Sequence, residues 1–237
     1  MRNRKYLIGA LVGVIGVFAF SGVASATPTA QTLQTTIAPT KFDKKQFSGA
    51  SLHNIIGTTF DNFATSQSPK TTTFTIDPNV KFVNGNIPPC ALSSIQGKFT
   101  AQAQAACPQS ITGGGTVEVN GGTSAGGIGG TVTFFSGGPT TIYVQTDIGP
   151  GATTLTIIGN IQGKQLVFSN IPNTPGLVLT KFDTTFNKRK TGKTSFYFMA
   201  RCKKKSWSTT ESTNFYSGET LSASSSQKCK QKKSKKK

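Results

Sequence analysis

His53 is the residue on which a serine or cysteine hydrolase site in this chain would depend, because the sequence holds one histidine. Imidazole changes charge near neutral pH, which suits it to general base work beside a nucleophile. His53 lies between Leu52 and Asn54, in a segment that we interpret as a strand or loop. A cysteine nucleophile would need a free thiol, and we expect none. We therefore interpret His53 as a partly buried or surface side chain.

Two other patterns resemble sites but lack a required part. Thr191-Gly192-Lys193-Thr194 resembles the end of a phosphate-binding loop, yet Asn187 stands where that loop needs glycine. The residues that follow read as a strand, whereas the motif needs a helix there. The eight Asp and Glu residues are too sparse to form a calcium loop or a recognisable glycosidase pair. We expect no catalytic, cofactor or metal site and a non-enzymatic protein, with a secreted hydrolase of unrecognised site as the alternative.

Positive charge is the strongest chemical signal in the chain. The formal net charge is +18, and the Lys181–Lys205 segment holds nine Lys or Arg against Asp183. The last ten residues hold seven lysines and no arginine, so this tail offers point charges rather than bidentate recognition. The anion-binding candidates are Lys188, Arg189, Lys190, Lys193, Lys203, Lys204, Lys205, Lys232, Lys233, Lys235, Lys236 and Lys237.

Such an excess of cations predicts attraction to anionic surfaces. For an exported protein these are anionic cell-wall polymers or membrane surfaces before nucleic acid. Two alternatives stay open: a module that binds nucleic acid outside the cell, and a lysine tail that serves solubility alone. Ligand identity and oligomeric state do not follow from the sequence.

The first 26 residues have the order of a secretory signal peptide. Arg2, Arg4 and Lys5 precede an uncharged apolar run over 6–20, and small residues lead to a cleavage site after Ala26. Fifteen apolar residues are fewer than the roughly 20 that cross a bilayer, and no later stretch is apolar enough. We therefore expect a secreted or extracellular protein that can associate with the cell envelope by charge, with no transmembrane segment after cleavage. Removing three cations changes the formal net charge from +18 to +15.

Four cysteines in an exported chain predict two disulfides. Three pairings are possible, and we favour Cys90–Cys107 with Cys202–Cys229 because each pair is local and brackets a separate segment. A zinc site is disfavoured, since the nearest cysteines are 17 residues apart and lack a close ligand pair.

The chain between these features predicts an all-β fold, an immunoglobulin-like or related β-sandwich. Apolar residues alternate with polar ones, as at Phe74 and Ile76, which is typical of half-buried strands. Frequent Asn-Gly and Pro-Gly turns separate these runs. We expect one domain over 27–227 and a disordered lysine-rich tail over 228–237.

One short helix fits between Cys90 and Cys107, where Leu92, Ile95, Phe99 and Ala103 recur at helical spacing, although a glycine within it disfavours a helix. Three aromatic residues lie between the last two cysteines. We interpret them as core packing, and the alternative is an aromatic-basic surface for sugars or nucleic acid. They are Trp207, Phe215 and Tyr216.

Several short motifs together resemble a family of uncharacterised secreted actinobacterial proteins. They are Pro88-Pro89-Cys90, the segment Cys107-Pro108-Gln109-Ser110 with the glycines that follow, and the ordered Cys202, Trp207 and Cys229. The resemblance covers roughly residues 76–229. It implies a β-sandwich-like domain outside the cytoplasm and carries over no active-site residues. The sequence departs from the family at Thr112 and at the lysines that follow Cys202.

Overall fold

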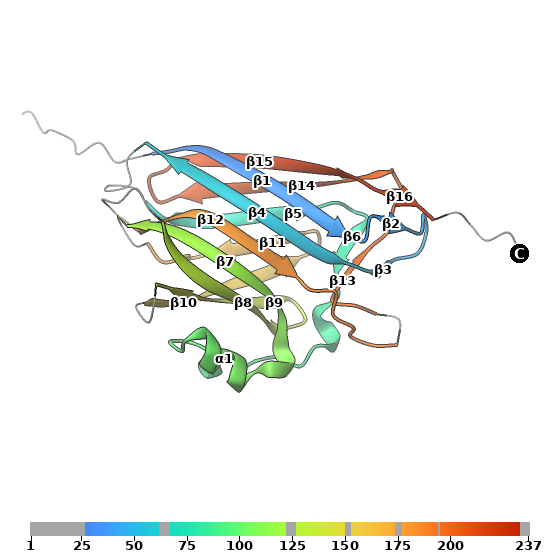
Figure 1. Ribbon diagram of the computed structural model, residues 1–237, viewed down its shortest axis with the longest axis horizontal. Helices are drawn as coiled ribbons and strands as arrows, with labels where there is room; N and C mark the ends of the chain where they lie inside the picture. Colours follow the sequence, from blue (N-terminus) through green and yellow to red (C-terminus); the bar gives the residue numbers. More distant parts are fainter. Residues whose placement is uncertain are drawn as a thin grey trace, which may run out of the picture.

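A computed structural model describes residues 27–61, 67–121, 127–149, 153–173, 177–193 and 195–232. The proposed signal peptide therefore lies outside the described residues, as do Lys233, Lys235, Lys236 and Lys237 of the tail. In the described part the fold is all-β with one α-helix, as predicted (Figure 1). Among the described helices, none is long and apolar enough to cross a membrane.

The main element is an 11-stranded sheet in which neighbouring strands run antiparallel. Its strands, in spatial order, are β1 (Pro28–Ala38), β4 (Ser51–Phe60), β12 (Leu177–Phe186), β7 (Ile111–Gly121), β8 (Ile128–Gly138), β9 (Thr141–Ile148), β10 (Thr153–Gln162), β11 (Gln165–Ser169), β5 (Pro69–Ile76), β14 (Ser206–Phe215) and β15 (Thr220–Lys228).

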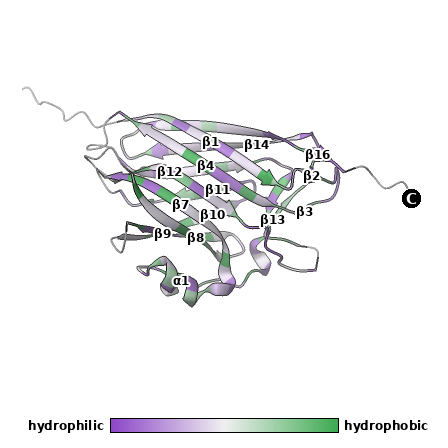
Figure 2. Cartoon of the chain, viewed as in Figure 1, coloured by the Kyte–Doolittle hydropathy of each residue, from purple (hydrophilic) through white to green (hydrophobic). Residues whose placement is uncertain are grey.

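Alternation along the strands separates an inner face from an outer one. In β14, positions 207, 209, 211, 213 and 215 are buried, and the positions between them are more exposed. The same period of two marks β4 and β5. This alternation appears in Figure 2 as successive bands of hydrophobic and hydrophilic residues along β1 and β4. The inner face therefore encloses one apolar core.

The sheet curls until its first and last strands, β1 and β15, lie side by side. An odd number of antiparallel strands leaves these two parallel. Side chains join them: Ile37 N donates to Gln227 Oε1, Gln227 Nε2 donates to Ile37 O at 3.1 Å, and Thr35 N donates to Ser225 Oγ at 2.9 Å. We call this closure the seam. The result is a barrel-like fold whose two halves face each other as sandwich layers do.

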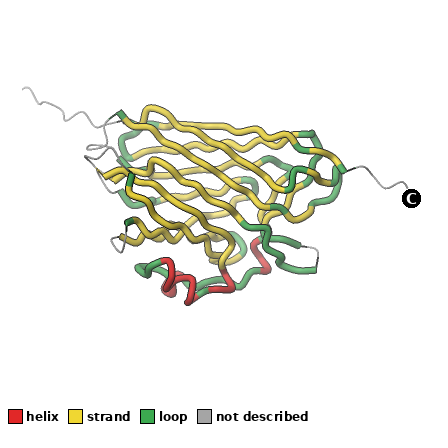
Figure 3. The backbone as a smooth tube through the Cα atoms, viewed as in Figure 1, coloured by secondary structure: helices red, strands yellow, loops and turns green. Residues whose placement is uncertain are grey.

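The outer face of β8 and β9 is covered by a helical segment (Figure 3). It contains η1 (Asn84–Asn86), η2 (Leu92–Ser94), α1 (Thr100–Ala106) and η3 (Pro108–Ser110). The predicted single helix is thus two pieces, and Gly97, at φ +71°, lies between them because glycine tolerates the left-handed region. The Cys90–Cys107 disulfide, formed as predicted, packs with Ile95, Ala103 and Phe135 beneath this cover.

Short strands close one end of the barrel, which we call the C-terminal end. β3 (Ser48–Gly49), β13 (Phe198–Ala200) and β6 (Val80–Phe82) form a small sheet there, and β2 (Lys41–Phe42) pairs in parallel with β16 (Lys230–Gln231). The second predicted disulfide, Cys202–Cys229, also forms. Ordered strands therefore continue to Gln231, beyond the expected domain boundary at 227, because β16 finds a partner in β2.

The opposite, N-terminal end is where β1, β5, β8, β10, β12 and β15 begin and the other barrel strands end. Thr27 lies there, and its backbone N donates to Asp61 Oδ1 at 2.9 Å. Its hydroxyl donates to Asp61 Oδ2 at 3.3 Å. Both oxygens of one carboxylate therefore join the start of β1 to the end of β4.

Candidate functional site

The lysines gather at the C-terminal end of the barrel, although they come from separate parts of the sequence. Three segments contribute exposed lysines, and two contacts hold them together: β16 pairs with β2, and a disulfide joins Cys202 to Cys229. We name the set the lysine end: Lys41, Lys44, Lys45, Lys203, Lys204, Lys205, Lys228, Lys230 and Lys232.

Backbone hydrogen bonds fix the segments of the lysine end relative to one another. Cys229 N donates to Lys205 O at 2.8 Å, and Lys232 N donates to Phe42 O at 2.7 Å. Gln231 Nε2 donates to the carbonyls of Cys202 and Lys203, both at 3.1 Å. The backbones are therefore ordered, while the long side chains that they carry are exposed.

The carboxylates near the lysine end are occupied by backbone donors. Asp43 Oδ1 accepts the N–H groups of Lys45 and Gln46 at 2.6 and 2.9 Å. The hydrogen bond from the Gln46 N–H lowers the pKa of Asp43 most, and the bond from the Lys45 N–H lowers it further. The positive charge of Lys232 acts in the same direction. Asp77 is buried and accepts from Asn79 and Ser208 N. These two acids offset only part of the positive charge.

The second predicted group of cations, Lys188–Lys193, lies on the segment between β12 and β13. Lys190 and Phe196 form a bridge, and Thr191 N donates to Ser195 O at 2.9 Å, so this segment is a turn and not a phosphate loop. Arg189 donates its guanidinium to the carbonyls of Gln109 and Ile111. It therefore holds the segment in place and has fewer donors for an anion.

His53 lies on the outer face and is paired with Asp183 across β4 and β12, with 2.6 Å between Nε2 and Oδ1. Both side chains are partly exposed. The cross-strand neighbours of His53 are Thr36 and Thr185. The partial exposure of His53 agrees with its interpretation as a partly buried or surface side chain.

Two of the three aromatic residues between the last cysteines belong to the core, as expected. Trp207 is buried against Phe42 at 5.4 Å between ring centroids, and its indole N–H donates to Arg201 O at 2.8 Å. Phe215 packs on Phe60 at 6.1 Å. Tyr216 is exposed, and its hydroxyl donates to Ile171 O at 2.9 Å.

The barrel interior holds a second candidate site, which sequence reasoning missed. A cavity of about 80 Å³ lies between the β5–β14 side and the β4–β12 side of the sheet. A neighbouring cavity of about 140 Å³ extends toward the N-terminal end, near Thr153 and Pro172. The two cavities are adjacent, because Ile157, Leu179 and Phe182 line both of them. A single ordered water needs only about 10–15 Å³ by the same measure.

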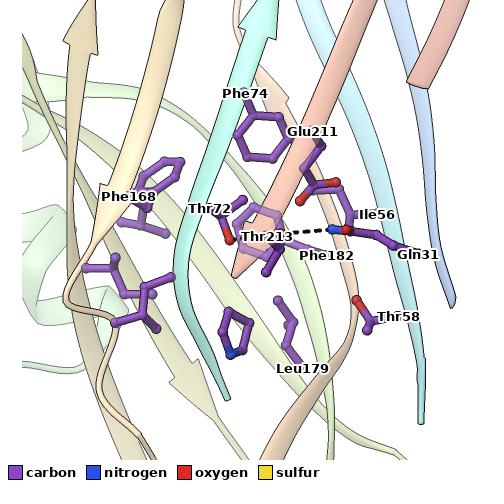
Figure 4. Close-up of a pocket in the computed structure, with 14 residues that line it drawn as sticks. Gln31, Ile56, Thr58, Thr72, Phe74, Phe168, Leu179, Phe182, Glu211 and Thr213 are labelled. Carbon is purple, nitrogen blue, oxygen red and sulfur yellow. Dashed lines mark hydrogen bonds between the residues drawn. The ribbon is translucent and has the colours of Figure 1, made fainter. Parts of the chain in front are cut away.

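Glu211 is the acid in this mainly apolar space (Figure 4). It is 2% exposed, and its Oε2 has no hydrogen-bond partner among the described residues. Burial raises the pKa of Glu211 to about 8, against smaller opposing effects of Thr213 and Gln31. Glu211 is therefore a neutral acid at neutral pH, held inside the barrel because it occupies an inward position of β14.

Gln31 and two threonines complete the polar side of the cavity. Gln31 Nε2 donates to Thr213 Oγ1 at 3.0 Å, drawn as the dashed line in Figure 4, and Thr213 Oγ1 lies 3.2 Å from Thr72 Oγ1. Gln31 Oε1, like Glu211 Oε2, is buried and has no partner within the described ranges. Two oxygens thus remain available in one apolar space.

The described residues contain no group of three or more His, Cys, Asp or Glu side chains that could hold a metal ion. Comparison with known proteins gives no match to a family model, a curated protein or a solved structure.

Proposed function

We propose that this protein is exported and binds anionic polymers of the cell envelope through the lysine end. The observation that carries the proposal is the convergence of exposed lysines from separate segments at one end of the barrel. Charge scattered over a surface is screened within about 8–10 Å at physiological ionic strength, whereas clustered charge acts together on a polyanion.

The residue type indicates attachment rather than selective recognition. Lysine is a compact point charge without the fixed fork by which arginine binds phosphate in two places. The neighbouring Arg201 donates to Asn79 Oδ1 and to Lys45 O, and Arg189 is committed to carbonyl groups, so lysines supply the exposed charge of the lysine end. The expected partner is therefore any dense polyanion of the envelope, with affinity that falls as salt rises.

The test is binding of the mature protein, residues 27–237, to immobilised polyphosphate over a salt series. The variant Lys203→Gln/Lys204→Gln/Lys205→Gln removes three charges from the lysine end. Each lysine at an anionic surface is worth about 1 kcal/mol, so affinity should fall about 100-fold at low salt.

The matched control is Lys70→Gln/Lys98→Gln/Lys181→Gln, which makes the same change in net charge away from the lysine end. It should weaken binding far less. Equal losses in the two triple variants would mean that net charge alone attracts the polymer and would refute the proposal. Vesicles of anionic lipid and duplex DNA serve as competitors, and stronger binding to either would reassign the partner.

A further inference from the structure

The barrel interior carries chemistry that polyanion binding does not use. Its walls come from strands on opposite sides of the sheet, and most of the lining side chains are apolar. Phe74, Phe168 and Phe182 line the inner part, while Leu155 and Ile148 line the part nearer the N-terminal end. Apolar walls hold water poorly, and such concave apolar spaces with a few polar groups are the usual form of small-molecule sites.

Four polar side chains gather on one side of this space, while Thr58 of β4 and Thr146 of β9 line it elsewhere. Glu211 and Thr213 come from β14, Thr72 from β5 and Gln31 from β1. Thr72 and Thr213 are within hydrogen-bond distance of each other, and Gln31 Nε2 is used by Thr213. What remains is Glu211 Oε2 and Gln31 Oε1, both buried and both without a partner in the described part of the chain.

A buried polar atom without a partner costs about 1–3 kcal/mol, so such atoms in native proteins point to a group that completes them. The carbonyl oxygen of Gln31 can only accept a hydrogen bond, whereas Glu211, neutral at pH 7, can donate its O–H or, beside an ammonium group, ionise and accept. A ligand that completes both must therefore donate an N–H or O–H to Gln31 Oε1 and also hydrogen-bond with the carboxyl of Glu211. A carboxylate ligand has no donor, so Gln31 Oε1 would stay without a partner.

We propose that the barrel interior binds a small amphiphile whose apolar chain occupies the two cavities and whose amine or alcohol head group donates a hydrogen bond to Gln31 Oε1 and forms a second hydrogen bond with the carboxyl of Glu211. The chain extends from Glu211 toward the N-terminal end, where Ser68, Thr153 and Pro172 border the second cavity. This is the end opposite the lysine end. A polymer bound at the lysine end would leave the border of the second cavity free, so the two sites act independently.

The experiment is isothermal titration of the mature protein at pH 7 with octylamine, octanol and octanoate. The three probes share one apolar chain and differ in head group. The mature chain has a formal charge of +15, so attraction to its surface alone favours octanoate. The interior site predicts the reverse order, with octylamine and octanol binding more tightly than octanoate.

Three variants place the binding in the barrel. Glu211→Gln keeps the shape of the side chain and should weaken octylamine about tenfold or more, because a charge-assisted hydrogen bond is lost, while octanol changes little. Ile157→Phe fills the wall shared by the two cavities and should weaken both probes. Glu118→Gln, an exposed acid on the outer face of β7, is the control and should leave both unchanged.

Three results would overturn the proposal. The first is no heat of binding with any probe, and the second is tighter binding of octanoate than of the other two probes. The third is an affinity for octylamine that neither Glu211→Gln nor Ile157→Phe changes. None of them bears on polyphosphate binding, which is measured separately with the lysine variants. Melting curves recorded for each variant show that the protein is folded before titration, and Glu211→Gln is expected to fold because it removes a buried ionisable group without changing volume.

Discussion

Replacing Glu211 by glutamine should change how the stability of this protein depends on pH. In the folded protein the pKa of Glu211 is raised from 4.5 to about 8 by burial. The folded chain therefore keeps a proton that the unfolded chain releases between these values. Stability from this group is fully present below pH 4.5 and is lost as pH rises toward 8.

The size of the effect follows from the two pKa values. Each pKa unit corresponds to about 1.4 kcal/mol, so the wild-type protein should lose about 3 kcal/mol between pH 4.5 and 7, and about 5 kcal/mol in all above pH 8. The groups around Glu211 from the neighbouring strands are Gln31, Thr72, Phe74 and Ile56, none of which titrates. The dependence thus belongs to Glu211 itself.

The assay is urea unfolding of disulfide-intact wild type and Glu211→Gln at pH 4.5, 6, 7 and 8.5. The two proteins should have similar stability at pH 4.5, and the variant should become the more stable by about 3 kcal/mol at pH 7. Glu118→Gln, which replaces an exposed acid, should follow wild type. Parallel curves for wild type and Glu211→Gln would refute the reasoning, since they would mean that Glu211 is hydrated or paired in the folded protein.

Two further perturbations test the closure of the barrel and the lysine end. Gln227→Ala removes both hydrogen bonds between Gln227 and Ile37 and should lower the free energy of unfolding in urea by about 1–3 kcal/mol. Ser226→Ala, on the exposed face of the same strand, is the control and should lower it little. Equal effects of the two variants would mean that the seam does not depend on Gln227. Replacing both Cys202 and Cys229 by alanine should cost about 2–4 kcal/mol and also weaken polyphosphate binding, because the disulfide joins two segments of the lysine end. The same double replacement at the Cys90–Cys107 disulfide should lower stability alone, and equal loss of polyphosphate affinity in both double variants would contradict a localised site.

Local patterns in the sequence were enough to predict the strands and both disulfides. Phe74 and Ile76 alternate with threonines because one face of β5 meets the core, and each disulfide joins cysteines close along the chain. The split of the predicted helix depends on Gly97, a residue visible in the sequence whose positive φ makes the break.

Features that depend on distant pairing could not be predicted. Gln227 contacts Ile37 only because eleven strands curl round together, and nothing near either residue indicates the other. Lys230 likewise pairs with Lys41 in the β16–β2 pair, and nothing near either residue in the sequence indicates this contact. The cavity acid did leave one signal: Glu211 falls in the inward phase of a strand whose other inward residues include Trp207 and Phe215, where a charge is out of place.

The contact between Thr27 and Asp61 would give the proposed cleavage after Ala26 a chemical consequence. Cleavage after Ala26 would turn the Thr27 amide nitrogen, already 2.9 Å from Asp61 Oδ1, into a free ammonium group. A neutral donor would become a cation facing a carboxylate, which strengthens the bond by a few tenths to about 1 kcal/mol at an exposed site. The precursor has no charge at that atom. The proposed removal of the leader would therefore itself add an ion pair that joins β1 to the end of β4 in the cleaved chain.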